Sequence, residues 1–279
     1  ELMSTSPSNS EFAIERGAPR AAAVIDIGAT SIRMAIAEIH PDGKVRTLDT
    51  LAQPMDLGRE AFENRRLSRK SIERSAAVLH RYQRVLQEYG IKPADVRVVA
   101  TTAVREAANR LAFADRIYVA TGLNVEPIDE AEVNRITYMG VMPQLQAHPA
   151  LADGKSLVVE VGGGNTEVLL VRGGNVLESQ SFRLGSLRLL RTLQGVRSSA
   201  SRRRAMMESH IRRAWNRLTD EKQDGSPVHV VAIGGDIRFA CKHILKNWDG
   251  KSLAEMPTRQ LDEFTSKILK LDEDAIVRR

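Results

Sequence analysis

Two carboxylates occupy matching places in two stretches of the sequence. Asp26 lies in an apolar run and Glu160 lies in a second one, and each run ends in glycine, as Gly28 in the first and as Gly162, Gly163 and Gly164 in the second. A glycine turn lets the backbone approach a phosphate closely, so that successive N–H groups point at its oxygens. A carboxylate nearby anchors the Mg²⁺ that accompanies a phosphate chain. The two stretches together predict a site for a phosphate chain and its metal.

The glycine turns differ in how strongly they indicate a ligand. For Gly28 alone an ordinary tight turn is an equal alternative, whereas three glycines in series cost conformational entropy and favour a function. A third turn, Gly234 and Gly235, follows the apolar run 228–233. Its place after a buried strand matches that of the other two.

Charge and composition narrow the class of ligand. The chain has 41 Lys and Arg against 35 Asp and Glu and a pI near 9.6, which favours a polyanion. Only 4% of the residues are aromatic, and no basic stretch has aromatic residues between its basic ones, which argues against a nucleic acid as the ligand. The six histidines are scattered, which argues against a histidine-based hydrolase or metal centre. The single cysteine, Cys241, cannot form an internal disulfide and is predicted to be buried.

The N-terminal segment has no targeting signature. Residues 1–20 lack the apolar stretch of a secretory signal, and no run of the chain is apolar enough to span a bilayer. We therefore expect a cytoplasmic protein without a membrane partner. Because residues 1–20 are rich in Ser, Pro and Glu without periodicity, they are predicted to form a flexible tail.

The first half of the chain alternates between strand and helix patterns. A three-stranded meander is predicted over 22–27, 32–39 and 45–51. Residues 71–89 place apolar side chains at three- and four-residue steps before Gly90, which predicts a helix. The remaining predicted elements are a strand at 96–100, a helix at 105–117 and a strand at 124–128.

The opening pattern recurs in the second half. Strands are predicted at 157–161, 167–171, 176–182 and 228–233, with a helix at 203–218. We therefore predict an α/β protein of two related domains, 21–127 and 128–279, that face each other across a cleft, where ligand sites usually form.

Six strings, in this order, resemble the successive signatures of the exopolyphosphatase and guanosine pentaphosphate phosphohydrolase (Ppx/GppA) family. They are VIDIGATSIRM, VVATTAVREAANR, AEVNRITYMGV, VVEVGGGNTEV, SFRLGSLRL and VAIGGDIRFA. The resemblance implies a fold of two actin-like (ribonuclease H-like) domains, dependence on Mg²⁺, and attack by water on a terminal phosphoanhydride bond of polyphosphate or guanosine pentaphosphate. Family members often form homodimers. Short members continue past the position of Arg279, so truncation of the second domain at its C-terminus is also an expectation.

The resemblance assigns the acids. It implies that Glu132 orients or deprotonates the attacking water, with a solvated acid at a helix start as the alternative. Asp26 and Glu160 would hold Mg²⁺ directly or through water, and Glu167 stands where the family has another active-site acid. These carboxylates end apolar strands, where burial is costly unless a cation or hydrogen-bond donors compensate for it.

The resemblance also assigns the phosphate-binding groups. Arg33 and Arg105 match its phosphate-facing arginines, although Arg33 has an outward salt bridge as an alternative. Donors within the turns would add contacts, namely Thr30, Ser31, Asn165 and Thr166. The basic residues of the predicted helix would guide a polymer or form a solvated helix face, and they are Arg202, Arg203, Arg204, Arg212, Arg213 and Arg217.

The chain departs from the family pattern near the expected base. The family has Ser-Gly and consecutive acids there, whereas this chain has Asp129-Glu130-Ala131-Glu132-Val133, which makes Glu130 the second candidate. Glu160 replaces an Asp and Asn165 replaces a Ser, and the longer Glu160 side chain predicts a different metal geometry. Ala29-Thr30 replaces Ser-Asn, and the loss of donors predicts weaker phosphate binding. Two other functions therefore stay open: a sensor that binds polyphosphate or alarmone without turnover, and an actin-like-fold kinase.

Overall fold

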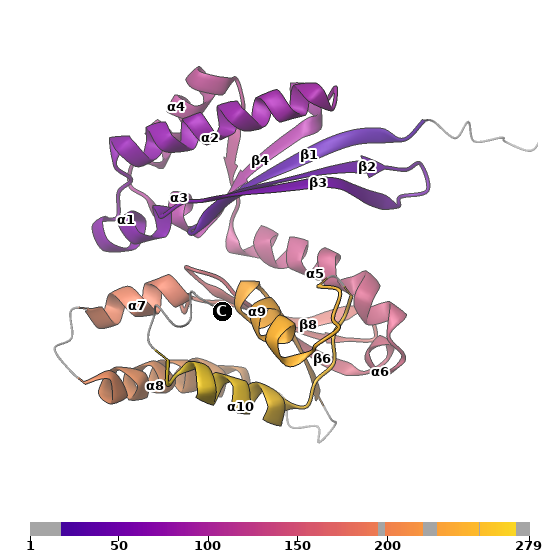
Figure 1. Cartoon of the computed structure of the whole chain (residues 1–279), viewed down its shortest axis with the longest axis vertical. Coiled ribbons are helices and arrows are strands. Elements are labelled where there is room, and N and C mark those ends of the chain that lie inside the picture. The colour runs from indigo at the N-terminus through magenta and orange to yellow at the C-terminus, as the bar shows by residue number, and fades with distance from the viewer. Residues whose placement is uncertain (1–17, 195–198, 220–227, 251, 272–279) are drawn as a thin grey trace, which may run out of the picture.

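The computed structural model describes residues 18–194, 199–219, 228–250 and 252–271. Its strands form two mixed sheets, one in each half of the chain, and the two halves face each other (Figure 1). Most of the predicted tail falls outside the described residues, and Arg20 already begins the first strand.

The first sheet has five strands in the order β3-β2-β1-β4-β5. The meander of β1, β2 and β3 is antiparallel, while β4 and β5 run parallel to β1. Their bounds are β1 (Arg20–Ile27), β2 (Ser31–Ile39), β3 (Val45–Pro54), β4 (Val96–Ala100) and β5 (Val125–Pro127). The predicted strands are confirmed, with ends that shift by up to three residues.

Helices cover this sheet and lie at its edge. They are α1 (Leu57–Asn64), α2 (Arg69–Glu88), η1 (Pro93–Asp95), α3 (Thr102–Glu106) and α4 (Arg110–Thr121). The single helix predicted at 105–117 was wrong, because the backbone is extended at Ala107. The Asn109 side chain then binds the backbone N–H and C=O of Leu67 at 2.9 and 2.8 Å, which ties the break to the start of α2.

The first core lies between the meander and α2 and α4. Ile32, Met34 and Ile36 alternate with exposed residues along β2 and are at most 1% exposed, as are Phe113 and Ile117 of α4. Burying one such side chain stabilises the fold by roughly 1.5–3 kcal/mol. This core fixes the strand ends from which the candidate site projects.

The second sheet repeats the arrangement of the first. Its order is β8-β7-β6-β9, with an antiparallel meander and β9 parallel to β6, just as β4 is parallel to β1. Its strands are β6 (Lys155–Val161), β7 (Thr166–Arg172), β8 (Asn175–Phe182) and β9 (Val228–Ile233). The internal repeat predicted from the sequence is confirmed.

The helices of the second half are α5 (Glu130–Ala147), α6 (Pro149–Ala152), α7 (Ser186–Gln194), α8 (Ala200–Thr219), α9 (Gly235–Ile244) and α10 (Thr258–Ile268). Figure 1 shows α5 running between the two halves. Met142 and Leu145 of α5 pack on Val158 and Leu169 of the sheet.

Each described helix is too short or too polar to cross a lipid bilayer. The domain boundary near residue 127 is a proposal that fits the start of α5.

Candidate active site

The turn between the first two strands is built in the same way in both sheets. In the first sheet the Gly28 N–H donates to the Ser31 carbonyl at 2.9 Å, and in the second the Gly162 N–H donates to the Asn165 carbonyl at 2.9 Å. Each bond closes a short turn at the end of an apolar strand. The backbone repeat therefore occurs at the two places predicted to bind phosphate.

The carbonyl oxygens of the second turn all accept hydrogen bonds from the beginning of α7. The acceptors are Gly162, Gly163 and Gly164, and the donors are the N–H groups of Gly185, Ser186, Leu187 and Arg188, over 3.0–3.1 Å. In a trans peptide the N–H points opposite to the C=O of the preceding residue. The N–H groups of residues 163–165 therefore point away from α7, and successive donors of this kind form an anion-binding concavity.

The first turn is held in a similar way by the segment that follows its own hairpin. The Ala29 carbonyl accepts from the Gly58 N–H at 2.8 Å, and the Thr30 carbonyl accepts from the Met55 N–H at 2.9 Å. Because Gly58 belongs to α1, each turn rests on the helix that follows its meander. Both turns are thus preorganised by backbone contacts.

Two glycines that the sequence patterns did not indicate make these contacts close. A Cβ on Gly185 would lie 2.3 Å from the carbonyl carbon and oxygen of Gly163, and a Cβ on Gly58 would lie 2.9 Å from the Cβ of Ala29. Neither position has room for a side chain. Gly185 stands in the string SFRLGSLRL, which was an available signal, whereas Gly58 lies in a short helix that no pattern predicted.

The two turns touch each other across the two halves. The position of a Cβ on Gly163 is 3.2 Å from Thr30 Cγ2 and 3.3 Å from Ala29 Cβ, and that on Gly164 is 2.9 Å from Thr102 Cγ2. Glycine at these positions lets the halves approach closely. A phosphate chain held by one turn would therefore lie close to the other.

Asp26 and Glu160 lie close enough for their charges to interact. Burial raises the pKa of Asp26 above its ordinary value, Arg33 on the paired strand lowers it, and the Glu160 carboxylate raises it further. Asp26 Oδ1 is buried and has no hydrogen-bond partner among the described residues. A buried carboxylate oxygen without a donor is stabilised by a cation, so this pair fits a divalent metal.

The donor set fits Mg²⁺ bound together with its substrate. Within the part of the chain that the structure describes, no three His, Cys, Asp or Glu side chains form a metal-binding group. Mg²⁺ usually takes one or two carboxylates and keeps waters and substrate phosphate oxygens as its other ligands. A hydrogen bond from Thr137 Oγ1 to Glu160 Oε2, at 3.0 Å, orients the Glu160 carboxylate.

Glu167 lies directly opposite Glu160 on the paired strands β7 and β6. It is 6% exposed, its Oε1 accepts from Ser181 Oγ at 2.9 Å, and its Oε2 is buried without a described partner. Burial raises the pKa of Glu167 to about 7, the hydrogen bond from Ser181 lowers it, and the Glu130 and Glu160 carboxylates raise it. Glu167 therefore carries a proton for part of the time at neutral pH.

Arg105 and Asn165 connect Glu130 to the site. Arg105 Nη1 donates to the Ile128 carbonyl at 2.8 Å, and its Nη2 lies 3.4 Å from Glu130 Oε1. Asn165 Nδ2 donates to the same carboxylate oxygen at 3.3 Å and to Ser181 Oγ at 3.1 Å. The predicted residues Arg105 and Asn165 thus meet around an acid that was only the second candidate.

Glu132 has different neighbours. Its carboxylate accepts from Arg135 Nε at 2.7 Å and from Arg135 Nη2 at 2.8 Å, and Arg97 Nη2 lies at 3.6 Å. The hydrogen bonds from Arg135 hold the pKa of Glu132 below its ordinary value. Among the described residues, Arg105 and Asn165 form hydrogen bonds with other partners and not with Glu132.

Arg33 lies at the rim of the first turn. It pairs with Asp26 across β1 and β2, and its Nε donates to Ser31 Oγ at 3.0 Å. Its side chain is exposed, so the guanidinium is accessible to an anion while it remains close to the Asp26 carboxylate. The phosphate contact predicted for Arg33 and its salt-bridge alternative both stay predictions.

The remaining predicted donors lie beside the second turn. Thr166 Oγ1 donates to the Leu184 carbonyl at 2.6 Å, so its proton is committed to the segment that leads into α7. Gly234 has φ of 126°, and a Cβ there would lie 3.1 Å from the Val161 carbonyl oxygen. Gly235 begins α9, so the third glycine turn puts a helix N-terminus next to the end of β6.

Arg188 links α7 to the first half of the chain. Its Nε donates to the Gly164 carbonyl at 2.8 Å, its Nη2 lies 2.8 Å from Glu106 Oε1, and its guanidinium lies 4.2 Å from the centre of the Phe62 ring. Arg183 binds the other oxygen of Glu106 at 2.8 Å. The sequence patterns did not indicate these side chains.

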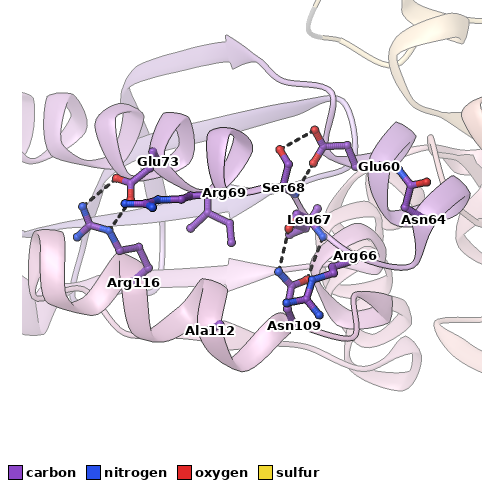
Figure 2. Close-up of a pocket in the computed structure, with 11 residues that line it drawn as sticks. Glu60, Asn64, Arg66, Leu67, Ser68, Arg69, Glu73, Asn109, Ala112 and Arg116 are labelled. Carbon is purple, nitrogen blue, oxygen red and sulfur yellow. Dashed lines mark hydrogen bonds and ion pairs between the residues drawn. The ribbon is translucent and has the colours of Figure 1, made fainter.

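A separate hollow of about 770 Å³ lies between α1, α2 and α4 (Figure 2). None of the predicted site residues lines it. Its carboxylates already have partners, since Glu60 accepts from Ser68 and Glu73 accepts from Arg116 at 2.8–2.9 Å. The hollow is a structural junction, and the candidate chemistry lies at the two turns instead.

The arginines of α8 lie on a mostly exposed helix. Arg204 pairs with Glu208 at 3.0 Å, and the side chain of Arg217 falls outside the described residues. An exposed helix with such a pair fits the solvated face, and the guiding role stays a prediction. Cys241 is buried, as predicted.

Solved structures share this fold. The Ppx/GppA enzyme of Aquifex aeolicus is 25% identical and has a TM-score of 0.73 over 94% of this chain and 85% of that one. An exopolyphosphatase of Cytophaga hutchinsonii is 21% identical, with a TM-score of 0.77 over 90% of this chain and 80% of that one. The predicted α/β fold of two facing halves is confirmed by the two sheets and by these likenesses.

Sequence comparison gives the same relationship. A guanosine-5'-triphosphate,3'-diphosphate pyrophosphatase of Aliivibrio fischeri is 29% identical over 163 residues, which is 58% of this chain and 31% of the relative. A bifunctional 3-dehydroquinate synthase/phosphatase of Fusobacterium nucleatum is 28% identical over 173 residues, or 60% of this chain and 25% of the relative. The chain spans about a third or less of the length of these curated relatives. Residues 35–277 match the Ppx/GppA phosphatase family, and the chain belongs to that family.

Proposed function

We propose that the chain is a Mg²⁺-dependent phosphoanhydride hydrolase that releases the terminal phosphate of inorganic polyphosphate or guanosine pentaphosphate. The observation that carries this proposal is the contact between two glycine turns of the same hydrogen-bond pattern, with Asp26 and Glu160 electrostatically coupled beside them. The pyrophosphatase and exopolyphosphatase names of the relatives support the same class of reaction.

The backbone and the arginines bind the substrate. The N–H groups of residues 163–165 donate to the oxygens of one phosphoryl group, and the first turn holds its neighbour. Arg105, whose side chain is 19% exposed and whose direction is fixed by the Ile128 carbonyl, neutralises charge on the transferred group. These groups orient the terminal phosphorus for in-line attack by water.

Asp26 and Glu160 would hold the metal. When bound, Mg²⁺ supplies positive charge to the phosphate oxygens and lowers the repulsion that an attacking water meets. Without a cation, the two carboxylates would repel a phosphate chain. The pair therefore makes phosphate binding conditional on the metal.

The test is phosphate release by the purified protein. Long-chain polyphosphate and guanosine pentaphosphate are each incubated with Mg²⁺, with EDTA, and with the Asp26→Asn variant. We expect release from at least one substrate, only with Mg²⁺, and a loss of about 10²-fold or more in the variant. No release from either substrate with Mg²⁺ would reject the proposal.

A sensor that binds without turnover is the second candidate. The observation that favours it is the engagement of Glu132, the expected base, by Arg135 and Arg97. Tight binding of polyphosphate in a calorimeter, combined with no phosphate release, would support the sensor over the hydrolase.

A further inference from the structure

We propose that Glu130, rather than Glu132, is the catalytic base that accepts the proton of the attacking water. This inference rests on the proposed hydrolysis and names the residue that performs one of its steps. Two observations support it: Glu130 and Glu132 lie on opposite faces of α5, and their carboxylates have different hydrogen-bond partners.

The first turn of α5 divides its side chains between two faces. Residues three, four and seven apart share a face of a helix, which groups Glu130 with Asn134 and Thr137. Asn134 is 7% exposed, and Thr137 Oγ1 donates to Glu160 Oε2 at 3.0 Å, so this face is directed to the site. Glu130 begins the helix on that face.

The opposite face carries Glu132. Its neighbours there are Arg135, at 2.7 Å, and Met139, which is 58% exposed. With Arg97 also at 3.6 Å, both oxygens of Glu132 are occupied by guanidinium groups. An acid held in this way is a weak proton acceptor, because protonation would break charge-assisted hydrogen bonds.

Glu130 has the contacts and the access that a base needs. Its Oε1 lies 3.3 Å from Asn165 Nδ2 and 3.4 Å from Arg105 Nη2, which orient the carboxylate. Both of its hydrogen bonds to described residues are made by Oε1, and its side chain is 47% exposed, so a water can reach Oε2. Asn165 belongs to the second glycine turn, which places the carboxylate beside the predicted phosphate position.

The other nearby acid suits this step less well. Glu167 is 6% exposed, so an attacking water has little access to its carboxylate. Its Oε1 is occupied by Ser181. The residue on the face of Glu130 one turn further along is Val133, which offers no proton acceptor. Glu130 is therefore the accessible carboxylate next to Arg105.

The step balances in atoms and charge. The water oxygen forms a bond to the terminal phosphorus while the bridging P–O bond breaks, and the electron pair of that bond stays on the shortened phosphate chain. One proton of the water moves to Glu130 Oε2. Glu130 then returns this proton to solvent or to the leaving phosphate before the next turnover.

The experiment compares Glu130→Gln with the matched variant Glu132→Gln on long-chain polyphosphate with Mg²⁺. We expect Glu130→Gln to lower kcat by about 10²- to 10⁴-fold, the usual contribution of a general base, with KM changed by less than about threefold. Glu132→Gln should stay within about threefold of wild-type kcat, since it loses only its ion pairs with Arg135 and Arg97, which lie on the other face of α5. Far-UV circular dichroism and urea unfolding establish that both variants fold.

A second variant separates a base from a structural role. Glu130→Ala leaves space beside Arg105, so added formate should restore part of its kcat, whereas it should not affect Glu132→Ala. Wild-type kcat in Glu130→Gln would overturn the proposal, and so would a loss confined to Glu132→Gln. If wild type releases no phosphate from either substrate, the proposed function itself fails and the base assignment fails with it.

Discussion

Arg188 and Glu106 form a 2.8 Å ion pair between α7 in the second half of the chain and α3 in the first. The same guanidinium donates to the Gly164 carbonyl at 2.8 Å. The two side chains are 15% and 22% exposed, so water screens them only in part. The pair therefore couples the position of the second glycine turn to the neighbouring half.

A double-mutant cycle should measure this coupling. We expect Arg188→Met and Glu106→Gln to share a coupling energy of about 1–2 kcal/mol in urea unfolding, because the pair is partly buried and hydrogen-bonded. The matched control is Arg259 and Glu263, an exposed i,i+4 pair at 2.8 Å, which should couple by no more than about 0.5 kcal/mol. Equal coupling energies for the two pairs would contradict the interpretation.

Gly185 should not tolerate a side chain. An added Cβ would lie 2.3 Å from the Gly163 carbonyl, so we expect Gly185→Ala to destabilise the fold by about 2–4 kcal/mol and to impair phosphate binding. Gly140→Ala is the control, because the interior of α5 offers open space there and alanine favours a helix by up to about 1 kcal/mol. Urea midpoints check both, and a wild-type midpoint for Gly185→Ala would refute the packing assignment.

Glu167 should make stability depend on pH in the absence of metal. Because its folded pKa is raised from 4.5 to about 7, its favourable contribution is complete below pH 4.5 and is lost as pH rises through 7. Glu167→Gln should therefore be more stable than wild type at pH 8 by about 3 kcal/mol, and the advantage should disappear near pH 4.5.

Glu132→Gln provides the control for that experiment, because the pKa of Glu132 is shifted in the opposite direction from that of Glu167. The pKa of Glu132 is lowered, so its contribution is present above pH 4.5 and is lost as pH falls further. Glu132→Gln should consequently lose stability relative to wild type at neutral pH. Urea unfolding in EDTA between pH 4 and pH 8 measures both variants, and a pH-independent difference for Glu167→Gln would show that its carboxyl is not perturbed.

Asp26→Asn should remove metal binding without destabilising the metal-free fold. Its Oδ1 is buried without a described partner, and burial raises the pKa of this carboxyl, so the neutral amide should leave the metal-free protein at least as stable as wild type. Mg²⁺ should then raise the melting temperature of wild type but not of the variant. An equal rise in both would place the metal elsewhere.

The repeated folding pattern could be predicted because its signals are local. Alternating and continuous apolar runs gave the strands of both meanders, including β4 at 96–100 and β9 at 228–233 with the bounds that the structure has. The helix α1 was missed because it has only eight residues. The break between α3 and α4 was missed because Asn109 makes it through contacts with Leu67, which lies 42 residues away in the chain.

The candidate site was less predictable because it depends on the direction in which each side chain points. The positions of Asp26 and Glu160 follow from strand ends, which the sequence marks clearly. The distinction between Glu130 and Glu132 depends on which face of α5 meets the second turn, and two residues along a helix reverse that face. The helix start at Asp129, whose side chain accepts from the Glu132 N–H at 2.8 Å, was the signal that could have set the register.

The two meanders have the same backbone arrangement, but the charged residues at matching positions differ. Where β1 and β2 set Asp26 opposite Arg33, β6 and β7 set Glu160 opposite Glu167. One half therefore presents an acid beside a base, and the other presents two acids. A row of phosphates lying between the halves would therefore meet different side-chain charges at successive phosphoryl groups, so the phosphoryl positions along the row would not be equivalent to the protein.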